Sequence, residues 1–132
     1  MISSHIPNVP APVNEPIKQY APNSAEALAL QTEWDRMAAI KYDIPCVING
    51  KEVFTDKTEN VVMPHNHQHV LGVSYLAGDA ELNAAADAAI ATQEKWRSMP
   101  WQARAAIFLK AADLLAGPFR NTINAATMLG QS

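Results

Sequence analysis

The segment WRSMPWQARAAIFLKAADLLAGPFR, residues 96–120, constrains the fold of this chain more than any other stretch. Apolar residues recur in it at intervals of three and four, which is the spacing of one face of a helix. Pro100 suits the first turn of such a helix, while Gly117, which tolerates a left-handed cap, and then Pro118 end it. The segment therefore predicts a capped amphipathic helix that packs in the core. Its apolar face consists of Ile107, Phe108, Ala111, Leu114 and Leu115.

The first 22 residues contain five of the nine prolines of the chain. Each proline removes a backbone donor and restricts the preceding residue to extended geometry, which excludes a helix or a central strand. We interpret residues 1–22 as a Pro-rich arm, either a disordered tail or, as a narrower prediction, an ordered arm anchored on a larger body by Val13, Ile17 and Tyr20. The prolines are Pro7, Pro10, Pro12, Pro16 and Pro22.

A helix is predicted directly after the arm, at about 24–40. Asn23 and Glu26, three residues apart, resemble a capping box, in which both side chains bind backbone N–H groups at the start of a helix. One face of this helix is apolar, and Trp34 is expected to be its core anchor. The face consists of Ala27, Leu30, Trp34 and Met37.

Two β-hairpins are predicted to follow. The first spans residues 44–54, where Asn49 and Gly50 separate two β-prone runs and give the strongest signal for a two-residue type I′ turn. Both turn residues should then have positive φ, and Pro45 places the first strand at an edge. The second hairpin pairs VVM with VLGVSYL and leaves PHNHQH as its turn. The four strands are expected to form one small sheet.

Three helices complete the predicted order. Asp79, after Gly78, is expected to cap an alanine-rich helix. The amphipathic helix described first follows across a proline-containing turn, and a last helix at about 119–129 should close at Gly130 as its C′ glycine. The prediction is therefore an α+β order of arm, helix, two hairpins and three helices.

Composition and charge argue against several classes of function. The chain has 132 residues, enough for one domain, and its net charge of −3 with ten scattered Lys and Arg disfavours a nucleic-acid partner. No apolar run approaches the roughly 18 residues of a membrane span. The amino terminus has no charged region before an apolar core and no arginine before Arg36, so no targeting segment is indicated. We expect a cytoplasmic, bacterial protein, or one of the mitochondrial matrix if it is eukaryotic.

Cys46, the single cysteine, is a candidate nucleophile. A reactive thiolate needs a helix terminus or a cationic neighbour to lower its pKa, whereas Cys46 is predicted in mid-strand between Pro45 and Val47. We therefore interpret it as a structural residue that behaves as a small hydrophobe.

Three histidines suggest a metal site as a second candidate. If the segment were extended, His65, His67 and His69 would point to one side, and three imidazoles can hold zinc with an open position. Against this, the segment falls at a predicted turn, begins with Pro64 and has no nearby Cys or acidic ligand. We expect no metal here, and zinc remains the alternative.

No motif for catalysis or for cofactor binding is evident in the sequence. It contains no GxGxxG, no P-loop and no Ser, Cys or Lys nucleophile in a recognisable elbow. We accordingly assign no catalytic, cofactor-binding or metal-ligating residue to this chain.

Several segments resemble the aldehyde dehydrogenase superfamily and, within it, the Δ1-pyrroline-5-carboxylate (glutamate-semialdehyde) dehydrogenase family. They are IPCVINGKEVF, PHNHQHVLG and FLKAADLLAGPFR, with NEPIKQYAP and ATMLGQS near the two ends of a similarity that extends from about Asn14 to Ser132. The resemblance implies an α/β aldehyde dehydrogenase fold, in which residues 23–132 form the amino-terminal edge of an NAD-binding domain, incomplete here, behind the arm at 1–22. It also identifies PHNHQHVLG as a hairpin turn that binds no metal.

The reaction of that family is attack of a cysteine thiolate on an aldehyde, hydride transfer to NAD and hydrolysis of the thioester. The resemblance implies oxidation of L-glutamate γ-semialdehyde to L-glutamate in proline catabolism by a homo-oligomer. It places the nucleophile, the glutamate base, the oxyanion-site asparagine and the NAD-binding stretch beyond Ser132, in the remainder of the dehydrogenase polypeptide. The 132 residues alone are therefore expected to be inactive and to bind no NAD. The alternative is a free-standing helical interaction module without catalysis.

Overall fold

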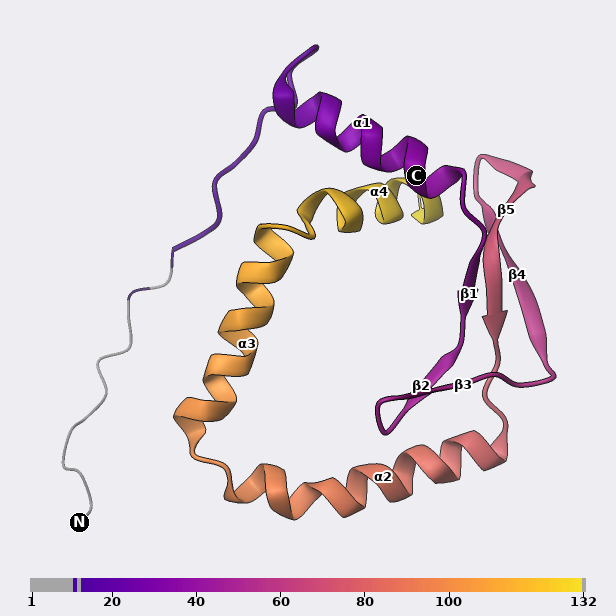
Figure 1. Cartoon of the computed structure of the whole chain (residues 1–132), viewed down its shortest axis with the longest axis vertical. Coiled ribbons are helices and arrows are strands. Elements are labelled where there is room, and N and C mark those ends of the chain that lie inside the picture. The colour runs from indigo at the N-terminus through magenta and orange to yellow at the C-terminus, as the bar shows by residue number, and fades with distance from the viewer. Residues whose placement is uncertain (1–10, 12, 132) are drawn as a thin grey trace.

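A computed structural model describes residue 11 and residues 13–131, and Figure 1 shows the path of the chain. The part of the predicted arm at 1–10 and 12 lies outside the described residues. The predicted α+β order is confirmed, with one helix, then β-structure, then three helices. The elements are α1 (Ala25–Ala38), β1 (Tyr42–Ile44), β2 (Cys46–Ile48), β3 (Lys51–Val53), β4 (Thr58–Met63), β5 (Asn66–Tyr75), α2 (Asp79–Ser98), α3 (Trp101–Ala116) and α4 (Arg120–Gln131).

The described part of the arm has no regular secondary structure and is held by α4. Val13 and Ile17 are 89% and 88% exposed, so the described residues do not cover them, and their role as anchors on a larger body stays a prediction. Hydrogen bonds from α4 hold the arm, because oxygen atoms of the arm can accept them without any apolar contact. Arg120 donates to the backbone oxygen of Pro16 at 2.9 Å, and Asn124 donates to the hydroxyl of Tyr20 at 3.2 Å.

The helix α1 forms where the sequence predicts it, but its cap is a different residue. Ser24 is the N-cap, and its hydroxyl accepts a hydrogen bond from the backbone N–H of Ala27 at 3.2 Å. The prediction that Asn23 caps the helix is wrong, because Asn23 has a φ of 63° and belongs to the preceding turn. Asparagine adopts this left-handed conformation more readily than most residues. Asn23 therefore lies in the turn, and Ser24 caps the helix.

The hairpin of β2 and β3 has the predicted turn. Asn49 and Gly50 have φ values of 51° and 72°, so both central residues are in the left-handed region, as a type I′ turn requires. The strands pair antiparallel, with Ile48 opposite Lys51. This hairpin forms a two-stranded sheet of its own.

The other sheet contains a strand that the sequence did not indicate. Its order is β1–β5–β4; β4 and β5 pair antiparallel as predicted, while β1 pairs with β5 in parallel. The expectation of one four-stranded sheet is wrong, because Pro45 separates Ile44 from the hairpin and leaves it at the end of β1. Proline cannot donate to a ladder, so the run IPCVI is divided between two sheets.

The start of α2 also differs from the prediction. Gly78 is the N-cap, so Asp79 is the first helical residue and not the cap. The backbone N–H of Gly78 donates to the carboxylate of Glu81 at 2.8 Å. Glu81 thus satisfies the backbone N–H of Gly78, and Asp79 lies in the first turn.

The two glycines near the ends of α3 and α4 behave differently from expectation. Gly117 ends α3 with a φ of −104°, so the predicted left-handed cap is wrong, and its N–H donates to the carbonyl of Asp113. The prediction that Gly130 lies just past the last helix is also wrong, because α4 continues through it to Gln131. A glycine inside a helix costs only about 1 kcal/mol relative to alanine, which the packing of α4 can offset.

The core of the described structure lies where α1 and α4 meet the strands β4 and β5. Met63, Leu71 and Leu129 form its buried cluster, and Trp34 packs against this cluster as predicted. Ala125 of α4 is fully buried. Helix α4 joins the core because these apolar residues lie on one of its faces.

Helices α2 and α3 do not join this core. Neither has a buried residue, so the prediction that the apolar face of α3 is buried is wrong for this chain. Ile107, Phe108 and Leu115 are 50%, 67% and 52% exposed. The apolar periodicity indicates which face of α3 is suited to burial, but no element within the described residues buries it.

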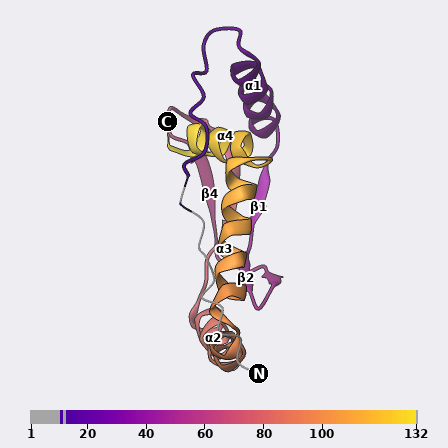
Figure 2. The same ribbon diagram turned by 90° about the vertical axis from the view of Figure 1, so that its left-hand side faces the viewer.

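Figure 1 shows why this cover is missing. The elements follow the sides of an open frame, with α1 and α4 at the top, α3 and α2 along two further sides and the strands on the fourth. Figure 2 shows the same frame from the side as a thin layer. Among the described residues, no helix is both long and apolar enough to cross a membrane.

Candidate functional site

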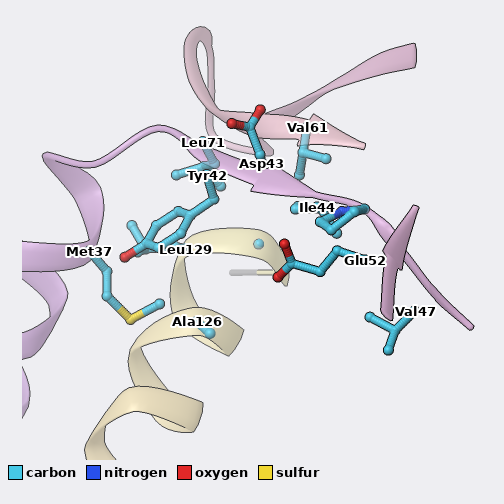
Figure 3. A pocket seen from close by; sticks show the side chains of 12 residues that line it. Met37, Tyr42, Asp43, Ile44, Val47, Glu52, Val61, Leu71, Ala126 and Leu129 are labelled. Atoms are coloured by element: carbon cyan, nitrogen blue, oxygen red, sulfur yellow. The ribbon is translucent and has the colours of Figure 1, made fainter. Parts of the chain in front are cut away.

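A pocket of about 470 Å³ lies between α4 and β1, and we call it the α4–β1 pocket (Figure 3). Met37, Leu71 and Leu129 extend the buried core into it. Ala126 and Gly130 line it from α4, where they lie one helical turn apart. Small residues at this spacing leave the helix backbone open to close approach by another element.

The strand side of the pocket is also mostly apolar. Ile44 of β1 and Val47 of β2 line it and are 44% and 70% exposed. Val47 lies opposite Glu52 in the hairpin, and Figure 3 shows the Glu52 carboxylate on the side facing α4. Glu52 makes no hydrogen bond or ion pair with the other described residues.

The remaining polar groups that line the pocket are Asp43 and Tyr42, and Figure 3 shows the Tyr42 hydroxyl pointing toward Met37. The hydroxyl of Tyr75 donates to the Asp43 carboxylate at 3.3 Å. Burial raises the pKa of Tyr75, and the negative charge of Asp43 raises it further. Tyr42 has a buried hydroxyl that forms no hydrogen bond of ordinary geometry. These groups do not form an acid–base pair directed into the pocket. The pocket can therefore hold an apolar group, but these groups do not provide a general acid or base for catalysis.

The sequence pointed to Met37, Pro45 and Gly130 as local structural residues but did not indicate that they share a pocket. The residues of the pocket come from seven elements, and their proximity depends on the parallel pairing of β1 with β5, which joins distant parts of the chain. The one local signal is the pair of small residues, Ala126 and Gly130, on an otherwise amphipathic helix.

Cys46 lies in β2 and is half-buried. Its thiol donates to the backbone oxygen of Tyr75 at 3.2 Å, which ties the hairpin to the end of β5. This geometry supports the structural interpretation of Cys46, because the sulfur contacts an acceptor and not a cation that would favour the thiolate.

The three candidate metal ligands do not share one extended segment. The turn between β4 and β5 is Pro64 and His65 alone, so the predicted six-residue turn is wrong, and His67 and His69 lie in β5. His69 Nε2 is 2.9 Å from the carbonyl oxygen of Ala38, at the end of α1. Within residues 13–131, no three His, Cys, Asp or Glu side chains are grouped to hold a metal ion.

We predict that the purified chain binds no stoichiometric zinc. His65 lies in the turn while His67 and His69 lie in β5, and the three imidazoles are not grouped around one position. The measurement is elemental analysis after the metal-free protein is reloaded with zinc and desalted. About one ion per chain, lost in a His67→Ala variant, would contradict the prediction.

A polar cluster joins α1 to α4. Arg36 donates two hydrogen bonds of 2.8 Å to the Glu33 carboxylate, and Thr122 donates a third of 2.8 Å. These contacts, first with Arg36 and then with Thr122, lower the pKa of Glu33 from 4.5 to about 2. The same carboxylate raises the pKa of Arg36.

Acid is therefore expected to weaken the contact between α1 and α4. The folded-state pKa of Glu33 lies below its ordinary value, so its stabilising contribution is complete above 4.5 and is lost as the pH falls toward about 2. The measurement is the thermal midpoint by circular dichroism between about pH 5 and about pH 2.5. The Glu33→Gln variant should lose less over this interval, and an identical pH dependence in both proteins would refute the assignment.

Side chains already occupy N–H groups at two helix N-termini that could otherwise face a phosphate of NAD. Dinucleotide phosphates bind free backbone N–H groups at a helix N-terminus behind a glycine-rich turn. At α1 the Ser24 hydroxyl already accepts a hydrogen bond from the N–H of Ala27. At α2 the Glu81 carboxylate accepts one from the N–H of Gly78, and its negative charge would also repel a phosphate. Pro100, before α3, has no N–H to offer.

Comparison with known proteins gives one consistent family. The model of the aldehyde dehydrogenase family matches residues 53–129. The Δ1-pyrroline-5-carboxylate dehydrogenase of Agaricus bisporus is 41% identical over 124 residues, which are 93% of this chain and 23% of that protein. The mitochondrial Δ1-pyrroline-5-carboxylate dehydrogenase of Homo sapiens is 41% identical over 118 residues, which are 89% of this chain and 21% of that protein.

A solved structure agrees with these relatives. The crystal structure of the Δ-pyrroline-5-carboxylate dehydrogenase from Mycobacterium tuberculosis bound with NAD matches with a TM-score of 0.93 and 46% identity, and the match covers 98% of this chain and 24% of that one. The predicted resemblance and the predicted fold class, an α+β segment of the aldehyde dehydrogenase fold, are confirmed. The chain spans less than a quarter of the length of each of these proteins.

Proposed function

Because this chain belongs to the aldehyde dehydrogenase family, we propose that it is the amino-terminal part of an NAD-dependent dehydrogenase that oxidises L-glutamate γ-semialdehyde to L-glutamate in proline catabolism. The observation that carries the proposal is the match to the Mycobacterium tuberculosis enzyme, with 46% identity over 98% of this chain. Both curated relatives described above have the same activity in their names, which supports this substrate over other aldehydes.

In this proposal the chain has a supporting role. Residues 1–22 form the arm, and residues 23–132 form the amino-terminal portion of the NAD-binding domain. NAD would accept the hydride from the substrate, and the residues that hold it belong to the remainder of the polypeptide. The cysteine nucleophile also belongs there, because Cys46 is engaged with Tyr75. The complete enzyme is a homo-oligomer, placed in the cytoplasm of a bacterium or, as in the human relative, in the mitochondrion.

The coding DNA that follows the codon for Ser132 tests this proposal. We expect the reading frame to continue into a cysteine-containing segment of the aldehyde dehydrogenase type. The longer polypeptide should then reduce NAD when it is given pyrroline-5-carboxylate, measured by absorbance of NADH. Replacement of its nucleophilic cysteine by alanine should abolish turnover, while Cys46→Ala should not.

An interaction module is the second candidate, and the exposed apolar faces of α2 and α3 favour it. A stop codon after Ser132, together with expression of the short protein in the source cells, would support this candidate. A longer polypeptide that binds NAD but does not oxidise pyrroline-5-carboxylate would refute the proposed substrate and leave the family assignment intact.

A further inference from the structure

The turn of the β2–β3 hairpin holds a side chain and a backbone group that can react with each other. Asn49 is the only asparagine in the sequence that is followed by glycine. Both turn residues are exposed, and a Cβ atom at Gly50 would meet nothing within 4 Å. Among the described residues, the N–H of Gly50 donates to no acceptor. An amide carbon and a backbone nitrogen are therefore adjacent in the chain and uncovered.

Such a pair can lose ammonia without an enzyme. The backbone nitrogen of Gly50 attacks Cγ of Asn49, and the new C–N bond closes a succinimide ring. The bond from Cγ to the side-chain nitrogen breaks, and that nitrogen leaves as ammonia with the proton from the Gly50 amide. Water then adds to one of the two ring carbonyls and opens the ring, which leaves either aspartate or isoaspartate. The reaction requires only water and mild base.

The folded turn opposes this ring closure. Closure requires the nitrogen of Gly50 and Cβ of Asn49 to lie on the same side of the Cα–C bond of Asn49. In a type I′ turn the ψ of the first central residue is about +30°, which places these two atoms on nearly opposite sides of that bond. The φ values of 51° at Asn49 and 72° at Gly50 belong to this turn. The reaction therefore has to await opening of the hairpin.

The hairpin is weakly held, so it is able to open. Its two strands have three residues each and pair only with one another, and in Figure 1 its turn points away from the β1–β5–β4 sheet. A two-stranded hairpin by itself is marginally stable in water. Contacts with Tyr75 tie it to β5, namely the hydrogen bond from the Cys46 thiol and the edge-to-face contact of Phe54. Opening of so small a unit requires less free energy than unfolding of the chain.

Asn23 provides a comparison within the same chain. It also has a positive φ, 63°, and is followed by a small residue, Ser24. Here the following nitrogen is engaged, because the N–H of Ser24 donates to the carbonyl of Ala21 at 2.9 Å. Ser24 is also the N-cap of α1, a helix of 14 residues, which fixes this turn. Asn23 should therefore persist under conditions in which Asn49 reacts.

We propose that Asn49 is a site of spontaneous deamidation, and that formation of isoaspartate there makes opening of the β2–β3 hairpin irreversible. Isoaspartate directs the backbone through the former side chain and adds one methylene group to it. The two-residue turn between Ile48 and Lys51 then cannot re-form as type I′. Without the closed hairpin, the Cys46 thiol loses its acceptor on Tyr75. The inference is independent of the proposed function, because it uses only residues of the hairpin and its contacts.

The reaction is tested on the purified chain at mildly alkaline pH, in buffer and in concentrated urea, by peptide mapping with mass spectrometry. Enzymatic methylation of isoaspartyl groups distinguishes the two products. We expect Asn49 to convert in both solutions, but about tenfold to a thousandfold more slowly in buffer, because only the open hairpin reacts there. Asn23 should remain intact in buffer. Three results would overturn the inference: no conversion of Asn49 in buffer when the chain in urea has converted fully, equal rates in the two solutions, or equal conversion of Asn23 and Asn49 in buffer.

The structural consequence is tested by the rate at which Cys46 is alkylated. Asn49→Gly keeps a residue that tolerates positive φ but has no side-chain amide, and Asn49→Asp adds the charge of the product without the extra methylene group. After the same incubation in buffer, the isoaspartate fraction of the wild-type chain should be alkylated several-fold faster than fresh protein. Both variants should keep their initial rates, since a carboxylate resists attack by the backbone nitrogen. Unchanged alkylation of the isoaspartate fraction, or an equal increase in Asn49→Asp, would refute the irreversible opening.

Discussion

Replacement of Gly72 by alanine is expected to detach β1 from β5 and to destabilise the chain by about 1–3 kcal/mol, the range of overpacked sites. Gly72 lies opposite Tyr42 in the parallel pairing of these strands. A Cβ atom at Gly72 would lie 2.5 Å from the carbonyl oxygen of Tyr42. That oxygen belongs to the backbone, so it cannot rotate away as the end of a side chain would. The strand as a whole has to move.

The effect should be specific to this close approach, and Gly130→Ala is the control. A Cβ atom at Gly130 meets nothing within 4 Å, so this change should be neutral or slightly stabilising in the helix. The measurement is the urea midpoint of both variants at one protein concentration, together with hydrogen exchange of the amides of β1. Equal midpoints and unchanged protection would show that β1 tolerates the added methyl group.

The isolated chain is expected to be marginally stable, to self-associate and to have no dehydrogenase activity. In the described residues the buried hydrophobic core consists of Met63, Leu71, Ala125 and Leu129, whereas eighteen large hydrophobic residues are exposed. Apolar patches beyond a few hundred Å² rarely stay exposed on a monomer. The free edges of β1 and β4 add unpaired backbone groups, which favour edge-to-edge association.

The tests of this expectation are thermal melting, sedimentation and an NAD reduction assay with glutamate semialdehyde. Broad melting that depends on concentration and a mass above 14.4 kDa are expected. No turnover is expected, because the thiol of Cys46 is engaged with a backbone oxygen and side chains already occupy N–H groups at the starts of α1 and α2. A sharp thermal transition of a monomer would contradict the expected marginal stability. Turnover that persists in Cys46→Ala protein free of host enzymes would contradict the expected lack of activity.

Local features of this chain were predicted well because their causes lie within a few residues. The turn at Asn49 and Gly50 follows from two residues that tolerate positive φ. The interruption at Pro100 follows from its missing N–H, and the end of α3 before Pro118 follows from the same property. Helix caps were predicted less well: Ser24 and Gly78 displaced Asn23 and Asp79, because neighbouring residues competed for one position.

The sequence by itself determined the order of the four helices and the two hairpins, the family, and the apolar faces of α1 and α3. Only the tertiary structure decided that β1 pairs with β5, that Pro45 divides the run IPCVI between two sheets and that the α4–β1 pocket exists. It also decided which apolar faces are covered: that of α4 is buried against α1 and the strands, while that of α3 is not. The physical reason is that apolar periodicity is a local property of one helix, whereas burial of that face requires another element to pack against it.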